Sequence, residues 1–283
     1  MRHHVVGRLR LQTALAIASL LAGGEGVAAA NGSPDAGDQT VYRIDWPIDV
    51  GVTLGAAATG AALELLAPRL VRNDTCTCRS ADLPWFDRVA PGHDSRALLT
   101  GSDVLVAAAL LAPYGLDAWE LSQRRQWLGA FTSDAVVFSE VFALSLFATR
   151  VTKFAVQRPR PLLYDLSPEA MAQATPDAHL SFYSGHVSLA FASAGVYATT
   201  YALRHPDDRW WFVVAGGVTA GGAVATMRVL GGKHFPSDVA VGAIVGTSLG
   251  VAVPLLHRTA PRTRIAFAPS AAGGGLVVAL GRF

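Results

Sequence analysis

Six apolar segments of helical length constrain the fold of this chain more than any other feature. They are rich in small residues and lack the strict apolar–polar alternation of a half-buried strand. They occupy residues 49–67, 99–114, 131–155, 186–204, 210–229 and 238–256. Hydrophobic residues make up 51% of the chain, and much of that share is Ala and Gly, which let helices pack closely. The sequence therefore predicts an all-α fold, an up-and-down bundle of about six helices with its active site at one end.

The N-terminus has the three features of an export signal. Arg2, Arg8 and Arg10 form a positive start, and the apolar run that follows is short for a membrane span. The sequence "VAAANG" then offers a small-residue cleavage site after Ala30. We therefore interpret residues 1–30 as a signal peptide, with an uncleaved anchor as the alternative. A signal predicts an exported protein of the periplasm or cell envelope.

Composition divides the rest of the chain into four parts. Residues 31–48 form a polar linker, and residues 49–130 hold the N-terminal helices with a Cys-containing loop. Residues 131–260 form a core that holds the later helices, and residues 261–283 form a tail. In the tail, two short apolar runs flank Gly273, Gly274 and Gly275, which is a moderate signal for a β-hairpin. We expect that hairpin to follow the helical bundle.

The two cysteines, Cys76 and Cys78, form a C-x-C sequence. An exported protein meets an oxidising compartment, so both thiols are open to oxidation, although a disulfide between residues so close together would be strained. C-x-C lacks the two further ligands that a structural zinc site needs. The sequence predicts no metal site and leaves the redox state of the cysteines open.

The sequence does not decide whether the helices cross a membrane. The last three apolar segments have uncharged runs near the lower limit of spanning length. The first three carry acidic residues that are costly in lipid unless they face the protein interior, namely Asp49, Glu64, Asp103, Asp134 and Glu140. We expect Asp134 and Glu140 to be buried partners of nearby cations or hydroxyls. A cleaved signal followed by six spans would place residues 153–185 in the cytoplasm, whereas the distribution of arginines favours the opposite orientation.

Three polar clusters interrupt the apolar chain, in "KFAVQRPRP", "SFYSGH" and "MRVLGGKHFPSD". Each lies at the end of a helical segment, and an up-and-down bundle would bring all three to the same end. Together they supply three cations, two imidazoles, one carboxylate and a helix N-terminus. The residues are Lys153, Arg160, Ser184, Gly185, His186, Arg228, His234 and Asp238.

The chemistry of these side chains indicates a phosphate site. Lysine and two arginines repel one another unless an anion with several oxygens lies among them, and Arg binds phosphate oxygens bidentately. Backbone N–H groups at Ser184 and Gly185 would add donors at a helix N-terminus. Of two histidines, one can attack phosphorus while the other protonates the leaving oxygen. Asp238, four residues after His234, could accept a hydrogen bond from Nδ1 and leave Nε2 free to attack.

The three clusters resemble the K-x6-R-P, P-S-G-H and S-R-x5-H-x3-D signatures of the type 2 phosphatidic acid phosphatase and vanadium haloperoxidase superfamily. The resemblance covers residues 130–260 well, and it implies that the part at 131–260 is a helical phosphatase core. It implies a covalent phosphohistidine on His234, with His186 as general acid and Asp238 as the residue that orients the nucleophile. The resemblance further implies that no metal is required. The phosphate ligands that it implies are Lys153, Arg160, Ser184, Gly185 and Arg228.

Two positions depart from that pattern. Tyr183 stands where the family usually has Pro, and Met227 where it usually has Ser, which removes a hydroxyl beside the phosphate ligands. His205 and His257 lie outside the motifs, and we expect both at the surface.

The predicted function is a metal-independent phosphatase acting on a phosphomonoester or pyrophosphate, with a lipid phosphate favoured and no cofactor. One alternative is a vanadate-dependent haloperoxidase, in which vanadate would be the cofactor. The other is a non-catalytic envelope protein that binds phosphate or lipid. The net charge of +2 gives no case for a nucleic-acid partner. Membrane association, the identity of the ester and the oligomeric state stay open.

Overall fold

The computed structural model describes residues 40–71, 78–123, 127–259, 263–269 and 276–282. The expected signal peptide lies outside these residues. Within them, six long helices form a bundle, which confirms the predicted helical fold. They are α2 (Trp46–Leu70), α3 (Arg96–Leu121), α4 (Trp127–Val156), α6 (Gly185–Arg204), α7 (Trp211–Leu230) and α8 (Pro236–His257). Four short elements stand in the loops, α5 (Pro168–Ala172), η1 (Ser80–Asp82), η2 (Pro161–Leu163) and η3 (Pro176–His179).

Local sequence signals explain where several helices begin. The side chain of Ser95 accepts a hydrogen bond from the backbone N–H of Leu98 and so caps α3. Pro236 occupies the first turn of α8, where its missing N–H would have no helical partner in any case. The carboxylate of Asp238 accepts from the backbone N–H of Phe235 at the same helix start. These caps fix the ends of the helices from which the site is built.

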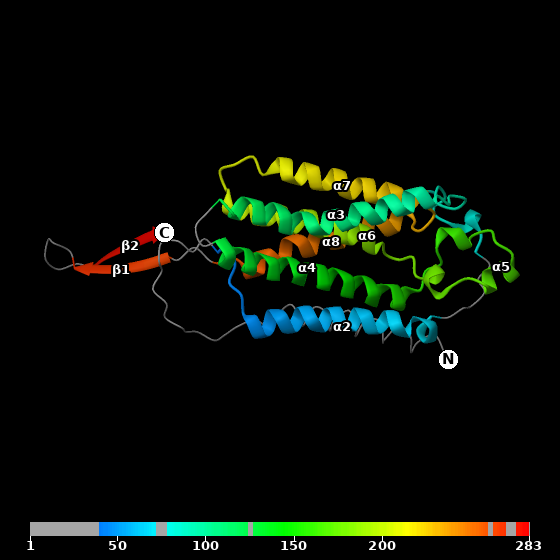
Figure 1. Ribbon diagram of the computed structural model, residues 1–283, viewed down its shortest axis with the longest axis horizontal. Helices are drawn as coiled ribbons and strands as arrows, with labels where there is room; N and C mark the ends of the chain where they lie inside the picture. The colour runs from blue at the N-terminus through cyan, green and yellow to red at the C-terminus, as the bar shows by residue number, and fades with distance from the viewer. Residues whose placement is uncertain (1–39, 72–77, 124–126, 260–262, 270–275, 283) are drawn as a thin grey trace. The chain divides into compact units, whose positions relative to one another are not determined.

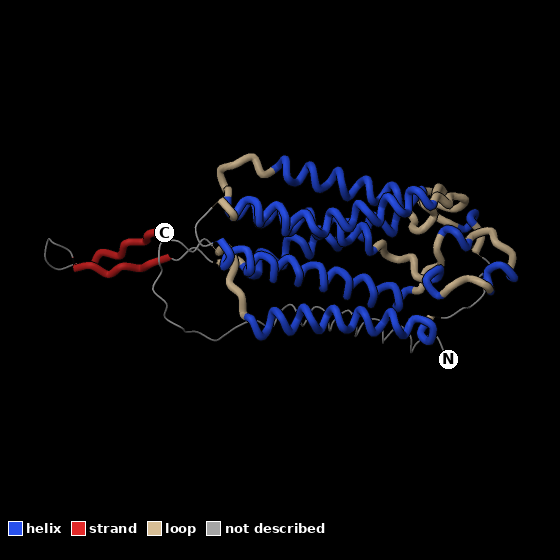
Figure 2. The backbone as a smooth tube through the Cα atoms, in the orientation of Figure 1, coloured by secondary structure: helices blue, strands red, loops and turns tan. Residues whose placement is uncertain are grey.

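The long helices run up and down, so that sequence neighbours are antiparallel (Figure 1). Helices α6 and α8 pack on each other at the centre, and α4 packs against both. Helix α2 lies against α4, while α7 lies against α3 and α6. Figure 2 shows that the loops gather at the two ends of the helices, and two long ones, at 78–95 and 157–184, lie at the same end. That end holds all three polar clusters.

The contact between α6 and α8 depends on a stripe of small residues. Gly242, Gly246 and Gly250 are spaced by four and lie on one face of α8. A Cβ atom at Gly246 would lie only 2.1 Å from the carbonyl oxygen of Ser188 on α6. The two helix backbones therefore come closer than any larger side chain would allow, as small-xxx-small stripes do in membrane bundles.

Five of the long helices have the length and apolar composition needed to cross a membrane, namely α2, α3, α4 with the residues just after it, α7 and α8. Large apolar side chains point outward from several of them. Leu65 is 83% exposed, Leu111 70% and Trp119 71%. A soluble monomer rarely exposes so many large apolar side chains, so this surface fits membrane association.

Of the five acidic residues in the apolar segments, Asp49, Asp134 and Glu140 are buried, whereas Glu64 and Asp103 are exposed. Asp134 is fully buried and forms an ion pair with Arg204, which also pairs with Asp117. The expectation that Asp134 is a buried partner of a cation is confirmed. Glu140 is also buried, and its neighbour is His257, whose side chain is only 13% exposed rather than at the surface as expected.

Beyond the bundle, the strands β1 (Thr263–Pro269) and β2 (Leu276–Arg282) are antiparallel, with Thr263 opposite Arg282. The turn between them lies outside the described residues, and no described contact ties the strands to the helices. The C-terminal hairpin therefore stays a prediction. Cys78 is disulfide-bonded, and the other cysteine of the chain, Cys76, lies outside the described residues.

Candidate active site

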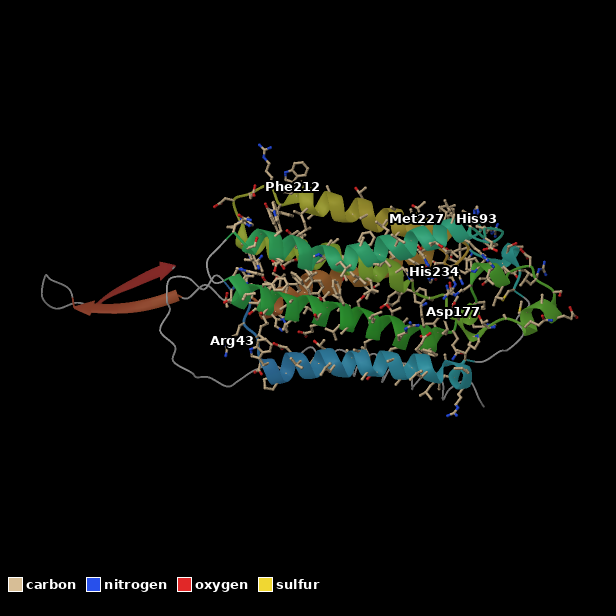
Figure 3. The ribbon with its side chains drawn as sticks, viewed as in Figure 1. Arg43, His93, Asp177, Phe212, Met227 and His234 are labelled. Carbon is tan, nitrogen blue, oxygen red and sulfur yellow. The ribbon has the colours of Figure 1, made fainter. Side chains whose placement is uncertain are left out.

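The three polar clusters meet at one end of the bundle. Lys153 lies in the last turn of α4 and Arg160 just after it, while Arg228 lies in the last turn of α7. His234 lies in the loop that leads into α8, and all four side chains are buried. Figure 3 shows His234 at the same end as Asp177, Met227 and His93, and at the opposite end from Arg43.

Close packing constrains the backbone conformation of the loop that carries His234. Gly232 has a φ of 72°, and a Cβ at this position would lie 1.9 Å from the carbonyl oxygen of His93. Only glycine fits such a turn. On the other side of His234, the fully buried ring of Phe235 packs with Leu83 and Ala90. His234 is thus held between a glycine turn and a buried aromatic anchor.

The surroundings of His234 keep its imidazole neutral. Burial lowers its pKa well below the usual value, and the charges of Arg160, Lys153 and Arg228 lower it further. Three cations from two different parts of the chain therefore act on one buried ring. Its Nδ1 atom has no hydrogen-bond partner among the described residues. A neutral, partly unsatisfied imidazole can act as a nucleophile.

Asp238 does not make the hydrogen bond to His234 that the sequence suggested. Its Oδ2 atom lies 3.6 Å from Nδ1 of His234, too far for a hydrogen bond. The carboxylate instead accepts from Arg158 at 2.7 Å, from the hydroxyl of Ser181 at 2.5 Å and from the backbone N–H of Phe235 at 3.0 Å. In this structure Asp238 ties the start of α8, next to the histidine, to the segments that carry Arg158 and Ser181.

The two neighbouring arginines have different surroundings. Arg158 pairs with Asp87 and Asp238 and lies 4.0 Å above the ring of Phe235, so its charge is used within the scaffold. Arg160 is 4% exposed and donates to the backbone oxygen and carboxylate of Asp177. Arg160, the residue selected by the six-residue spacing from Lys153, is therefore the one whose charge faces His234.

Ser184 and Gly185 differ in part from their expected geometry. The backbone N–H of Ser184 donates to the carbonyl oxygen of Asp238 at 3.1 Å and is not free for a phosphate. Its buried hydroxyl has no hydrogen-bond partner within the part of the chain that the structure describes. A Cβ at Gly185 would lie 3.0 Å from Cγ2 of Thr149, so the close approach that this glycine allows is between α6 and α4. The hydroxyl of Ser184 replaces its N–H as the candidate donor.

Asp103 is the main site residue that the motifs did not identify. It accepts from Nε2 of His186 at 2.8 Å and from Arg228 at 3.1 Å, and so links the second histidine to a cation. Burial and the charge of Arg228 lower the pKa of His186 to about 4, while Asp103 acts in the opposite direction. The only sequence signal for Asp103 was an acidic residue within an apolar segment.

The hydroxyl of Ser102 partly replaces the hydroxyl that Met227 lacks. Arg228 donates to the hydroxyl of Ser102, which comes from α3 and is fully buried. The thioether of Met227, which is on α7, lies against Gly101 of α3. Helix α3 therefore contributes two polar groups to the site although it carries none of the three motifs.

Two carboxylates hold the cations in place. Asp177 pairs with Arg160 at 2.5 Å and with Lys233 at 3.8 Å, and Asp103 pairs with Arg228. Both carboxylates are more than half exposed, whereas Arg160 and Arg228 are buried. The arrangement can therefore bind an anion with several oxygens if these two exposed carboxylates turn away from the arginines.

Comparison with known proteins agrees with this chemistry. Residues 134–262 match the model of the PAP2 superfamily. The chain is 28% identical to the decaprenylphosphoryl-5-phosphoribose phosphatase of Mycobacterium tuberculosis over 66% of its own length and 93% of that protein. It is 37% identical to the lipid A 1-phosphatase of Porphyromonas gingivalis, over 25% of its own length and 15% of that protein. The family match and the two names support a phosphoric ester hydrolase.

Proposed function

We propose that this chain hydrolyses a phosphate ester by metal-independent catalysis through His234, and the match of residues 134–262 to the PAP2 superfamily supports the proposal. One observation carries the proposal. A buried, neutral imidazole lies among three cations, and such a group of cations is suited to bind an anion with several oxygens. The proposed cycle uses the two histidines and the three cations.

In the first step, the phosphate binds among Lys153, Arg160 and Arg228. The imidazole of His234 attacks phosphorus, a P–N bond forms, and the bond from phosphorus to the leaving alcohol breaks. His186 gives its proton to that alcohol. In the second step, His186 takes a proton from water, the water oxygen attacks phosphorus, and the P–N bond breaks to release inorganic phosphate and neutral His234.

The cations act mainly on the transition state. Negative charge grows on the equatorial oxygens of the phosphoryl group as the bonds exchange, so fixed cations bind that state better than the ground state. The charge of the substrate also acts on His186. A phosphate dianion among the cations offsets the effect that lowers the pKa of this histidine, and the bound substrate thereby favours the protonated form that the first step needs.

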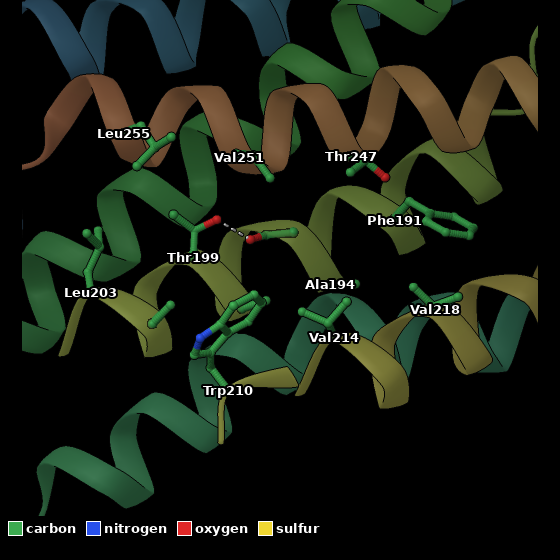
Figure 4. Close-up of a pocket in the computed structure, with 13 residues that line it drawn as sticks. Phe191, Ala194, Thr199, Leu203, Trp210, Val214, Val218, Thr247, Val251 and Leu255 are labelled. Carbon is green, nitrogen blue, oxygen red and sulfur yellow. Dashed lines mark hydrogen bonds between the residues drawn. The ribbon is translucent and has the colours of Figure 1, made fainter. Parts of the chain in front are cut away.

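A lipid phosphate is the substrate class that we favour. A cavity of about 360 Å³ lies between α6, α7 and α8, and a second of about 470 Å³ lies on the α3 side of α7. The first is lined almost entirely by apolar side chains, including Phe191, Val218 and Leu255 (Figure 4). It follows α6 from Phe191 to Leu203, about 18 Å at 1.5 Å per residue. An acyl or prenyl chain would fit this shape and polarity.

The names of the relatives support the same substrate class. One relative is named for lipid A and the other for a decaprenylphosphoryl compound. We further propose that this chain acts in the cell envelope, with its apolar helices in the membrane and the phosphate site near one membrane surface. Export and the orientation of the site belong to this proposal and rest on the N-terminal sequence and the distribution of arginines.

A phosphate-release assay tests the proposed function. The purified chain in mixed micelles is given phosphatidic acid, phosphatidylglycerol phosphate and undecaprenyl pyrophosphate, against soluble sugar phosphates and nucleotides. We expect release from at least one lipid, and we expect His234→Ala to lose essentially all of it while keeping its helical circular dichroism. His205→Ala is the matched control, because this histidine pairs with Glu120 outside the site.

Three results would contradict the proposal. Substantial activity in His234→Ala would exclude this residue as the nucleophile. Phosphate binding without release from any ester would favour a non-catalytic binding protein. Vanadate-dependent oxidation of halide by peroxide would favour a haloperoxidase.

A further inference from the structure

A second group of buried titratable side chains lies away from the phosphate site. It consists of Asp49 in the first turn of α2, Glu140 in α4 and His257 at the end of α8. Asp49 is 5% exposed and Glu140 is 7% exposed. Helix α8 has 22 residues, so its two ends, near His234 and at His257, are about 33 Å apart at 1.5 Å per residue. The proposed hydrolysis does not use these residues.

The hydrogen bond of His257 determines which of its ring nitrogens carries the proton. Nδ1 lies 2.9 Å from the carbonyl oxygen of Val253. A carbonyl can only accept, so Nδ1 donates and the neutral ring has its lone pair on Nε2. Nε2 lies 3.3 Å from Oδ1 of Asp49 and 3.3 Å from Oε2 of Glu140. A lone pair directed at two buried carboxylates is repulsive unless a positive charge lies among them.

A proton on Nε2 would satisfy this cluster only in part. One N–H cannot make good hydrogen bonds to two carboxylates, and one imidazolium would leave the buried group with a net negative charge. Glu140 Oε2 makes no hydrogen bond within the described residues, and no Lys or Arg there pairs with either carboxylate. The hydroxyl of Thr53, one turn after Asp49 on α2, is likewise buried without a partner. The site is polar and lacks a cation.

We propose that Asp49, Glu140 and His257 bind one zinc ion. One imidazole and two carboxylates are ligands that zinc accepts, and its charge would neutralise the cluster. Tetrahedral ligands about 2.05 Å from zinc lie about 3.4 Å from one another, close to the two separations of 3.3 Å. The carbonyl of Val253 holds the other ring nitrogen, as the outer partner of a metal-bound histidine commonly does. The fourth position is left for water.

Such an ion would act structurally. It would tie α2 to α4 and α8, and α2 lies outside the residues that match the family model whereas Glu140 and His257 lie inside them. The site joins three parts of the chain that are far apart in sequence, which is why no local spacing indicated it. The sequence suggested only the cysteines as zinc ligands, and it gave no sign that His257 is buried.

Metal content and thermal stability of the whole chain test this proposal. The chain is purified in detergent, treated with EDTA, dialysed, and then titrated with zinc sulfate. We expect one zinc per chain by mass spectrometry of the metal and a rise in Tm on addition of zinc. Cobalt in place of zinc should give the intense visible absorption of a four-coordinate site. A chain that takes up no zinc and whose Tm does not respond overturns the proposal, whatever the variants do.

Matched variants test whether the zinc ion binds at these three residues. Glu140→Gln and His257→Gln keep the size of each side chain, and each should weaken zinc binding at least ~10-fold. His205→Gln removes a histidine that pairs with Glu120 instead, and should keep full affinity. His234→Ala should also keep it, which separates this site from the phosphate site. Equal zinc binding by Glu140→Gln, His257→Gln and the wild type would show adventitious metal and overturn the assignment.

Discussion

His234 is held neutral by burial and by fixed positive charges, and this makes folding depend on pH. Its pKa in the folded chain lies well below the usual value, whereas in the unfolded chain it is ordinary, about 6.5. Below that pH the unfolded state binds a proton that the folded state does not. The free energy of unfolding therefore falls as the pH falls from about 6.5 toward the folded pKa, by up to about 1.4 kcal/mol per pH unit.

This effect predicts that the Tm of the wild type and the Tm of His234→Gln respond differently to acid. From about pH 7 to about pH 5.5, the Tm of the wild type should fall more than the Tm of His234→Gln, because glutamine does not titrate. Differential scanning fluorimetry in detergent measures both. An equal fall in the two chains would mean that other groups carry all of the acid sensitivity and that His234 is not a buried neutral imidazole.

At the scale of single residues, the sequence indicated some contacts of the site and not others. The spacing from Lys153 selected Arg160 over Arg158, and the structure turns Arg158 toward Asp87 and the scaffold. This selection rests on the K-x6-R-P signature of the resemblance, because both arginines lie beyond the end of α4 at Val156, where helical spacing no longer applies. The signature could not indicate Asp103, which reaches His186 from α3, since that contact depends on how two distant helices are placed in register. Their roles in catalysis stay predictions.

At the scale of helices, small residues decide how closely α6 and α8 pack. The number and approximate limits of the long helices could be predicted from apolar runs and breakers, because both are local properties. Which faces meet could not, because several helices carry small residues on more than one face. The backbone contact at Gly246 follows from the packed pair and from nothing in α8 alone.

Two glycine-to-alanine substitutions separate packing from helix propensity. Gly246→Ala places a Cβ 2.1 Å from the carbonyl oxygen of Ser188 and should destabilise the chain by about 1–3 kcal/mol. Gly222→Ala on α7 meets no atom within 4 Å and should stabilise it by about 0.5–1 kcal/mol. Denaturant or thermal unfolding in detergent measures both changes. Equal effects of the two substitutions would contradict the close packing of α6 on α8.

At the scale of the whole molecule, the outward apolar surface and the inward charges point to one environment. Large apolar side chains such as Leu65 and Leu111 are exposed, while charged groups such as Asp134 and Arg204 pair inside the bundle. This is the reverse of a soluble helical protein, in which the outer faces are polar. Lipid is the solvent that such a surface fits.

Cell fractionation tests this conclusion. A chain with a C-terminal epitope should remain in the membrane pellet after an alkaline carbonate wash and should be released by detergent. Release by carbonate alone would show that the helices do not span the bilayer. An exported soluble protein with a cleaved signal peptide serves as the control for recovery of the soluble fraction.

The backbone just before α2 pairs with the backbone just after α8. Tyr42 and Arg258 form an antiparallel bridge, and Arg43 donates to the carbonyl oxygen of His257 at 2.7 Å. The chain thus enters and leaves the helices at one place, at the end away from His234 (Figure 3). An enzyme immobilised on a solid support through either of these points would present its phosphate site away from the support, so attachment should not obstruct access of the substrate.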